Sequence, residues 1–147
     1  MKCHVHLTAY AKGALQNNKL SMLVEPYMKK IREMTGESVN LGIRYEDEVI
    51  IVNTINGEFY QLQTTLLPVS PLYCSGIGKL FLSECDDKYL EYYFSELPAR
   101  TINTITDFLT FKEHQRKIIN SGISIDNEEY EYGLSCYAVP IYNKKRN

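Results

Sequence analysis

Residues that could bind a small anion gather in the segment Pro71–Lys79, which reads Pro-Leu-Tyr-Cys-Ser-Gly-Ile-Gly-Lys. Ser75, Gly76 and Ile77 stand where an apolar strand is expected to give way to an apolar helix. Backbone N–H groups are unpaired at the start of a helix, so a carboxylate or phosphate can be held there. In the alternative interpretation, Ser75 only caps the helix and the glycines only allow close packing. The segment is not a P-loop, because Leu80 replaces the hydroxyl residue of that motif.

A second candidate segment brings an acidic group and a thiol back from a distant part of the sequence. Asp126 and Cys136 stand on two stretches that can return as antiparallel strands, so both side chains could face one cavity. The alternative is a solvated turn aspartate and a buried cysteine that acts as a small hydrophobe. Glu128 and Glu129 are interpreted as part of a solvated face or an interface and not as acid/base machinery. No catalytic signature accompanies the two segments, which together predict a binding pocket.

An enzyme that uses Cys136 with Asp126 is the alternative function. A nucleophilic cysteine generally requires a nearby histidine, and all three histidines lie outside both segments. Cys3, His4 and His6 suggest a metal site, but on a strand only the two histidines would share a face. We therefore expect no enzymatic activity, no metal and no cofactor.

Length and composition limit the classes of protein. A chain of 147 residues is expected to form one domain, residues 1–147. Its 16 basic and 18 acidic side chains leave a net charge of −2, whereas a domain that binds DNA by itself usually carries a basic patch. The four cysteines have irregular spacing, and the sequence contains no signal peptide and no long apolar run. These features predict a cytoplasmic protein that does not contact a membrane.

The spacing of apolar residues predicts helices mixed with strands. Periodic apolar residues predict helices at 8–16 and 20–34, the second with Pro26 inside it and Gly36 after its end. Asp86 or Asp87 is expected to cap another helix, and Thr110 with Glu113 resembles a capping box for a helix that ends at Gly122. The remaining predicted elements are a hairpin over 39–52, a strand at 59–65, a helix at 77–83 and strands at 123–125 and 134–141. This order predicts an α+β domain with an antiparallel sheet covered by helices.

Five motifs in this order resemble one known family. They are Thr35–Leu41, Pro71–Leu80, Thr104–Asp107, Asp126–Glu129 and Gly133–Cys136. Together they make the chain similar, from about Leu7 to Ile141, to the effector-binding domain of IclR-type bacterial transcriptional regulators. The resemblance implies a GAF-like fold, with a central antiparallel sheet, helices on it and a small-molecule pocket on one side.

The resemblance also implies how the chain relates to a whole regulator. Residues 1–20 would be a linker strand and helix from a DNA-binding domain that this sequence lacks, and His6–Thr8 resembles the end of its wing strand. The family pattern continues past residue 147 with a further strand and helix, which this sequence also lacks. Contact with DNA would occur only through the absent winged helix-turn-helix.

The predicted function is therefore that of a domain that senses a small organic acid and supports oligomerisation. Family members use an aspartate and a cysteine at the positions of Asp126 and Cys136 to hold a small oxo-acid. The predicted effector-binding residues are Tyr73, Ser75, Gly76, Ile77, Asp126 and Cys136. The expected partners are a small carboxylate or aromatic-acid effector and further copies of the chain, as a homodimer or homotetramer. Tyr73 and Cys74 depart from the usual His-Ala of the family, which leaves the preferred ligand open.

Overall fold

The computed structural model describes residues 3–58 and 69–142, with side chains from residue 19 onward. The predicted strand at 59–65 lies outside the described residues. The chain divides into two compact units, residues 1–70 and residues 71–147. We call these the N-terminal unit and the C-terminal unit and describe each by itself.

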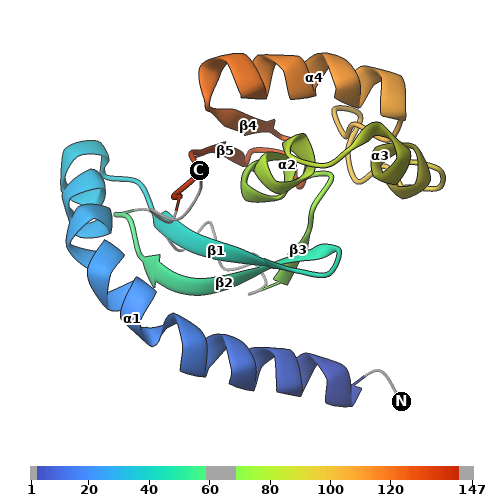
Figure 1. Ribbon diagram of the computed structural model, residues 1–147. Coiled ribbons are helices and arrows are strands. Elements are labelled where there is room, and N and C mark those ends of the chain that lie inside the picture. Colours follow the sequence, from blue (N-terminus) through green and yellow to red (C-terminus); the bar gives the residue numbers. More distant parts are fainter. Residues whose placement is uncertain (1–2, 59–68, 143–147) are drawn as a thin grey trace. The chain divides into compact units, whose positions relative to one another are not determined.

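The N-terminal unit is a long helix packed on a small antiparallel sheet. Its elements are α1 (Cys3–Thr35), β1 (Val39–Tyr45), β2 (Glu48–Ile55) and β3 (Val69–Pro71), and the strand order is β1-β2-β3. The predicted hairpin is confirmed, since β1 and β2 pair antiparallel from Val39↔Ile55 to Tyr45↔Glu48 (Figure 1). A hydrogen bond of 2.7 Å from Asn53 Nδ2 to Ser21 Oγ links the helix to the sheet. None of the predicted site residues lies in this unit.

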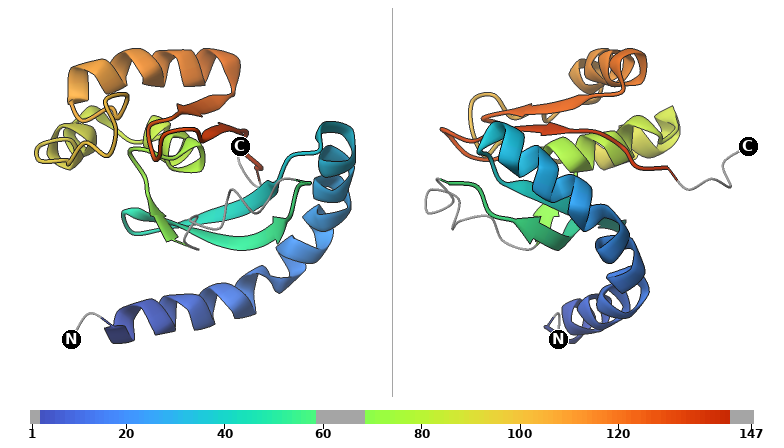
Figure 2. Two further views of the ribbon diagram at one scale, coloured as in Figure 1. Left: turned by 180° about the vertical axis from the view of Figure 1, so that it is seen from behind. Right: turned by 90° about the vertical axis from the view of Figure 1, so that its left-hand side faces the viewer.

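Helix α1 differs from its prediction in extent. Two helices were expected before residue 35, but the backbone is one helix that includes Pro26 and whose axis changes direction along its length (Figure 2). The strand-like ending expected at His6–Thr8 is wrong, because these residues are helical. Gly36 follows the helix as predicted: its φ is 76°, and its N–H donates to Arg32 O at 2.8 Å.

The C-terminal unit holds three helices and a second pair of strands. Its elements are α2 (Gly76–Ser83), α3 (Asp87–Tyr93), α4 (Phe108–Ser121), β4 (Ser124–Asn127) and β5 (Ser135–Ala138). Helix α2 contacts α4 and both strands, which are antiparallel (Figure 1). The α+β class is confirmed. The single central sheet is not seen, because the described strands form one sheet of three and one of two.

Two apolar clusters stabilise this unit. Leu80 of α2, Ile118 of α4 and Ala138 of β5 are buried together. At the start of α4, Phe111 stacks on Phe94 with ring centroids 4.7 Å apart. Burying a leucine, isoleucine or phenylalanine side chain contributes on the order of 2 kcal/mol, so the first cluster helps to hold α2 against α4 and β5, and the second joins the end of α3 to α4. None of the helices in the described part of the chain is long and apolar enough to cross a membrane.

The cap of α4 is Asp107, which corrects the predicted capping box. Its carboxylate accepts a hydrogen bond of 2.9 Å from the N–H of Thr110, so Thr110 lies inside the first turn. The Asp107 carboxyl has a pKa below its ordinary value, chiefly because the backbone N–H of Thr110 and then its hydroxyl stabilise the charged form. At the other end, Gly122 has φ 70° and ends the helix as predicted.

We expect Asp107→Ala to destabilise the C-terminal unit by about 1 kcal/mol, because an N–H at the helix start loses its acceptor. Glu113→Ala is the matched control: under the capping-box interpretation it would cost a similar amount, whereas here it should cost less than about 0.5 kcal/mol. Urea unfolding of the two variants decides between the caps. Equal losses would contradict the assignment of Asp107.

Candidate functional site

Asp126 and Cys136 lie directly opposite each other on neighbouring strands. In the antiparallel pair β4–β5, Asp126 is the partner of Cys136 and Ser124 is the partner of Ala138. The predicted antiparallel return of these two segments is therefore confirmed. Side chains of directly opposed residues point to the same face of a sheet. The carboxyl and the thiol consequently share one face of the pair.

The start of α2 packs against this same pair. A methyl group placed on Gly76 would lie 3.4 Å from Ala138 Cβ, 3.5 Å from the Cys136 carbonyl oxygen and 3.7 Å from the Asp126 nitrogen. The structure thus brings Gly76 together with Asp126 and Cys136, which lie 50 and 60 residues later in the sequence.

Two backbone donors at the start of α2 are open in the described part of the chain. Ser75 caps the helix: its Oγ accepts from the N–H of Gly78 at 3.1 Å and donates to Pro71 O at 2.9 Å. Among the described residues, no acceptor is seen for the N–H groups of Gly76 and Ile77. Helix starts leave such donors open, and they favour an anion. Ser75 itself is engaged in the fold.

The Asp126 carboxyl is buried and only half satisfied. The residue is 1% exposed, and its Oδ1 accepts from the N–H of Glu129 at 2.8 Å and of Tyr130 at 3.4 Å. Its Oδ2 is buried, and in the described part of the chain it has no hydrogen-bond partner. Burial raises the pKa of Asp126 to about 6, although the two N–H groups and the nearby Lys79 act in the opposite direction. An unpaired buried oxygen is costly, so this position is suited to a hydrogen-bonding ligand.

Both nearby thiols stay protonated at neutral pH. Burial raises the pKa of Cys136 to about 11 and that of Cys74 to about 12, and the charge of Asp126 adds to both effects. The thiolate is the nucleophilic form of cysteine, so neither residue is activated for attack. The raised pKa values of the two thiols therefore disfavour the thiol-enzyme alternative. Cys136 can instead act as a weak hydrogen-bond donor.

Glu129 corrects one interpretation made from the sequence. The sequence predicts that it belongs to a solvated face or an interface, but it is 4% exposed within the described residues, and its Oε1 accepts a hydrogen bond from Lys79 Nζ. Lys79 is fully buried, and it also donates to Ile125 O at 2.5 Å. The sequence signal for Lys79 was a single cation in an apolar helix; its partner could not be identified, because Glu129 lies 50 residues away.

The loop before α4 clamps the turn that carries Asp126. We call residues 126–130 the Asp126 turn. Thr101 Oγ1 donates to Glu128 O at 2.6 Å, and Thr104 Oγ1 donates to Glu129 O at 2.7 Å. Arg100 donates to Tyr130 O at 2.9 Å, with its guanidinium 4.1 Å from the centre of the Tyr130 ring. The Thr104–Asp107 motif therefore holds this turn and caps α4.

The structure also places Tyr73 and His114. The Tyr73 hydroxyl donates to Pro98 O at 2.8 Å and the ring is buried, so this phenol is part of the core. His114 is half-buried on α4, and its pKa is lowered by burial and by Lys79. The side chains of Cys3, His4 and His6 lie outside the described part, so the hypothesis of a metal site there concerns residues that the structure does not describe.

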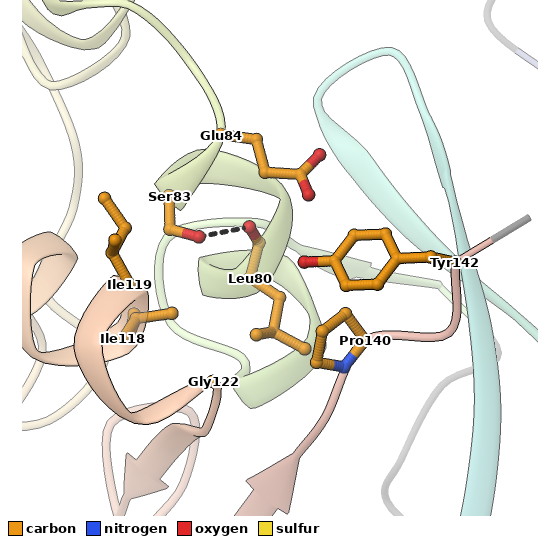
Figure 3. Close-up of a pocket in the computed structure, with 8 residues that line it drawn as sticks. All are labelled: Leu80, Ser83, Glu84, Ile118, Ile119, Gly122, Pro140 and Tyr142. Atoms are coloured by element: carbon orange, nitrogen blue, oxygen red, sulfur yellow. Dashed lines mark hydrogen bonds between the residues drawn. The ribbon is translucent and has the colours of Figure 1, made fainter. Parts of the chain in front are cut away.

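A separate pocket of about 160 Å³ lies between α2, α4 and the segment after β5 (Figure 3). We call it the α2–α4 pocket. It is lined by Leu80, Ser83, Glu84, Ile118, Ile119, Gly122, Pro140 and Tyr142. None of these is a predicted effector-binding residue. Its volume is small compared with the roughly 300–1,000 Å³ of most ligand pockets.

Comparison with known proteins identifies the class of domain. Residues 12–147 match the family model described as bacterial transcriptional regulator IclR C-terminal. The chain belongs to this family, which confirms the resemblance seen in the motifs.

Individual relatives agree with the family. The acetate operon repressor of Salmonella typhimurium is 30% identical over 96% of this chain and 53% of its own length. The DNA-binding transcriptional repressor YiaJ of Escherichia coli K12 is 29% identical over 92% of this chain and 50% of its own length. The crystal structure of IclR from Thermotoga maritima has a TM-score of 0.76 and 29% identity, over 94% of this chain and 57% of that one. The chain thus spans about half the length of the curated relatives it matches, and those relatives are named as transcriptional regulators.

Proposed function

We propose that this chain is the effector-sensing part of an IclR-type transcriptional regulator and that the effector is a small organic acid. The ligand's carboxylate binds the open N–H groups of Gly76 and Ile77. A second polar group of the ligand contacts the Asp126 carboxyl and the Cys136 thiol. The proposal includes no enzymatic step, because neither thiol is activated.

The observation that carries this proposal is the buried Oδ2 of Asp126, which has no partner among the described residues and lies on the strand against which Gly76 packs. The start of α2 therefore lies beside a strand that carries an unpaired buried oxygen. Ser75 and Tyr73 contribute indirectly in this proposal, because their hydroxyls hold the helix start and the loop at Pro98.

Aromatic acids are a suitable first set of probes. Two proteins of similar fold are described in complex with 3-hydroxybenzoic acid and with 4-hydroxybenzoate, with TM-scores of 0.69 and 0.79 to this chain. At 24% and 18% identity, these structures support the fold alone. Hydroxybenzoates and small aliphatic carboxylates should therefore be screened together by thermal shift, since a ligand that binds only the folded state raises its stability.

Asp126→Ala and Cys136→Ala should each weaken binding of an acid found in this screen. At pH values below about 6, where the Asp126 carboxyl is neutral, losing its hydrogen bond to the ligand costs about 0.5–1.5 kcal/mol, so Asp126→Ala should weaken the affinity roughly 2- to 10-fold. The thiol is a weaker donor, and the loss for Cys136→Ala should be smaller. Calorimetric titration measures both, with Ile119→Ala in the α2–α4 pocket as the control.

The pH dependence of binding follows from the raised pKa of Asp126. A neutral carboxyl tolerates an anionic ligand, whereas an ionised one repels it, so affinity should fall as the pH rises above about 6. If both variants bind the acid as the parent does, with the same pH profile, the proposed site is wrong.

Association and DNA contact belong to the proposed whole protein. We infer that the chain associates as a homodimer or homotetramer. DNA binding requires a winged helix-turn-helix elsewhere in the regulator, because a net charge of −2 gives this chain no excess of positive charge for phosphates.

A further inference from the structure

The buried ion pair between Lys79 and Glu129 is not explained by the proposed ligand contacts. Both residues are almost fully inaccessible, at 0% and 4% exposure. Lys79 comes from α2, and Glu129 comes from the Asp126 turn. One Glu129 oxygen, Oε2, is buried and has no partner in the described ranges. The pair therefore joins the two elements that form the proposed site.

The hydrogen bonds of this ion pair involve residues before and after Asp126 in the sequence. Lys79 Nζ donates to the carbonyl of Ile125, the residue before it, at 2.5 Å. Glu129, whose carboxylate meets Lys79, also donates its own N–H to Asp126 Oδ1 at 2.8 Å. Lys79 stands three positions after Gly76 on the same helix. Lys79 and Glu129 thus link the helix that begins at Gly76 to the turn that carries Asp126.

A gain in stability is a poor reason for burying these charges. Removing two charges from water costs several kcal/mol per ion, and apolar replacements of buried ion pairs are often neutral or stabilising. Fixed geometry is what an ion pair supplies and an apolar pair does not, because its hydrogen bonds have defined directions.

We propose that Lys79 and Glu129 are positioning residues for the effector site: their ion pair fixes the Asp126 turn relative to the start of α2 without contacting the ligand. This inference rests on the proposed function for its purpose. The geometry that it predicts can be measured without any ligand.

The test compares three variants of the chain, Lys79→Met, Lys79→Met/Glu129→Met and Glu129→Gln. The single methionine variant leaves Glu129 buried and unpaired, so the fold itself should be weakened. The double variant removes both charges and should recover the parent's urea midpoint. Amide hydrogen exchange measured by NMR then shows whether the Asp126 turn keeps its place. The N–H groups of residues 129 and 130 are followed because they donate to Asp126 Oδ1, and the N–H of Ile118 in α4 is the control.

In the double variant we expect the amides at 129 and 130 to exchange at least about tenfold faster than in the parent, while Ile118 is unchanged. A role in stability alone predicts that recovery of the urea midpoint also restores these two amides, and that result would overturn the proposal. If the double variant does not fold, Glu129→Gln, which keeps an acceptor for Lys79, should show the same local loss to a smaller extent. Parent-like exchange in a folded Glu129→Gln would then overturn it.

The same samples separate this inference from the proposed function. Titration with 4-hydroxybenzoate should shift the amides of Gly76 and Ile77 in the parent and shift them less in the double variant. If neither this acid nor the other screened carboxylates shifts these amides in the parent, the proposed function fails, while the exchange result still decides whether the pair fixes the turn.

Discussion

Replacing Gly78 by alanine is expected to destabilise the C-terminal unit by about 3 kcal/mol or more, at the upper end of what overpacking costs. The new methyl group would lie 2.3 Å from the Leu72 carbonyl oxygen and 2.4 Å from Leu72 Cα. Both atoms belong to the backbone, so a side-chain rotation cannot relieve the clash. The helix would have to move away from the segment before it. The Ser75 hydroxyl would then lose the hydrogen bond that it accepts from the N–H of residue 78.

Gly76→Ala is the matched control in the same helix. Its methyl group would approach Ala138 Cβ at 3.4 Å, which is close to ordinary contact, so the loss should be below about 1 kcal/mol. Urea unfolding of both variants, monitored by circular dichroism, measures the difference. Equal losses would contradict the close approach of α2 to Leu72.

Replacing Asp126 by asparagine should remove a large pH dependence of stability. The folded-state pKa of about 6 lies above the ordinary value of 3.8, so the folded chain binds more protons than the unfolded chain between these values. The contribution of Asp126 to the free energy of unfolding should therefore fall by about 3 kcal/mol as the pH rises from 4 through 6, and it should then level off. The amide introduced by Asp126→Asn does not titrate, and it keeps an oxygen in place of Oδ1.

The measurement is the difference in unfolding free energy between Asp126→Asn and the parent from pH 4 to pH 8. Taking the difference cancels groups that both chains share, such as Asp107, whose lowered pKa acts in the opposite direction. Asp126→Asn should gain relative to the parent as the pH rises. If the unfolding free energies of the variant and the parent change in parallel with pH, the pKa of Asp126 is not raised by burial and the account is wrong.

Local sequence signals predicted the parts of the fold that depend on local chemistry. Gly36 and Gly122 end their helices at left-handed φ, and Asp86 caps α3 through a bond of 2.8 Å to Tyr89 N. The antiparallel return of the segments that carry Asp126 and Cys136 was also predicted, and the structure adds the register that pairs these two residues. Each of these signals lies within about ten residues of the feature that it determines.

The sequence-based prediction was wrong where two neighbouring residues could both cap a helix, and where burial depended on a partner far away in the sequence. Asp107 and Thr110 both have the chemistry of a helix cap, and the bond between them makes Asp107 the cap. Glu129 stands in an acidic segment of the kind that is usually solvated, and only the fold shows that Lys79 lies against it. A buried ion pair between distant residues leaves no periodic pattern in the sequence, so spacing alone could not identify it.

The most direct test of the effector site is an NMR titration of the isotope-labelled chain with the acid that raises its melting temperature most. The account predicts that the largest shifts occur at the amides of Gly76, Ile77, Asp126 and Cys136, with smaller changes elsewhere in the C-terminal unit. Shifts that instead centre on Leu80, Ile118 and Ile119 would place the ligand in the α2–α4 pocket and contradict the account.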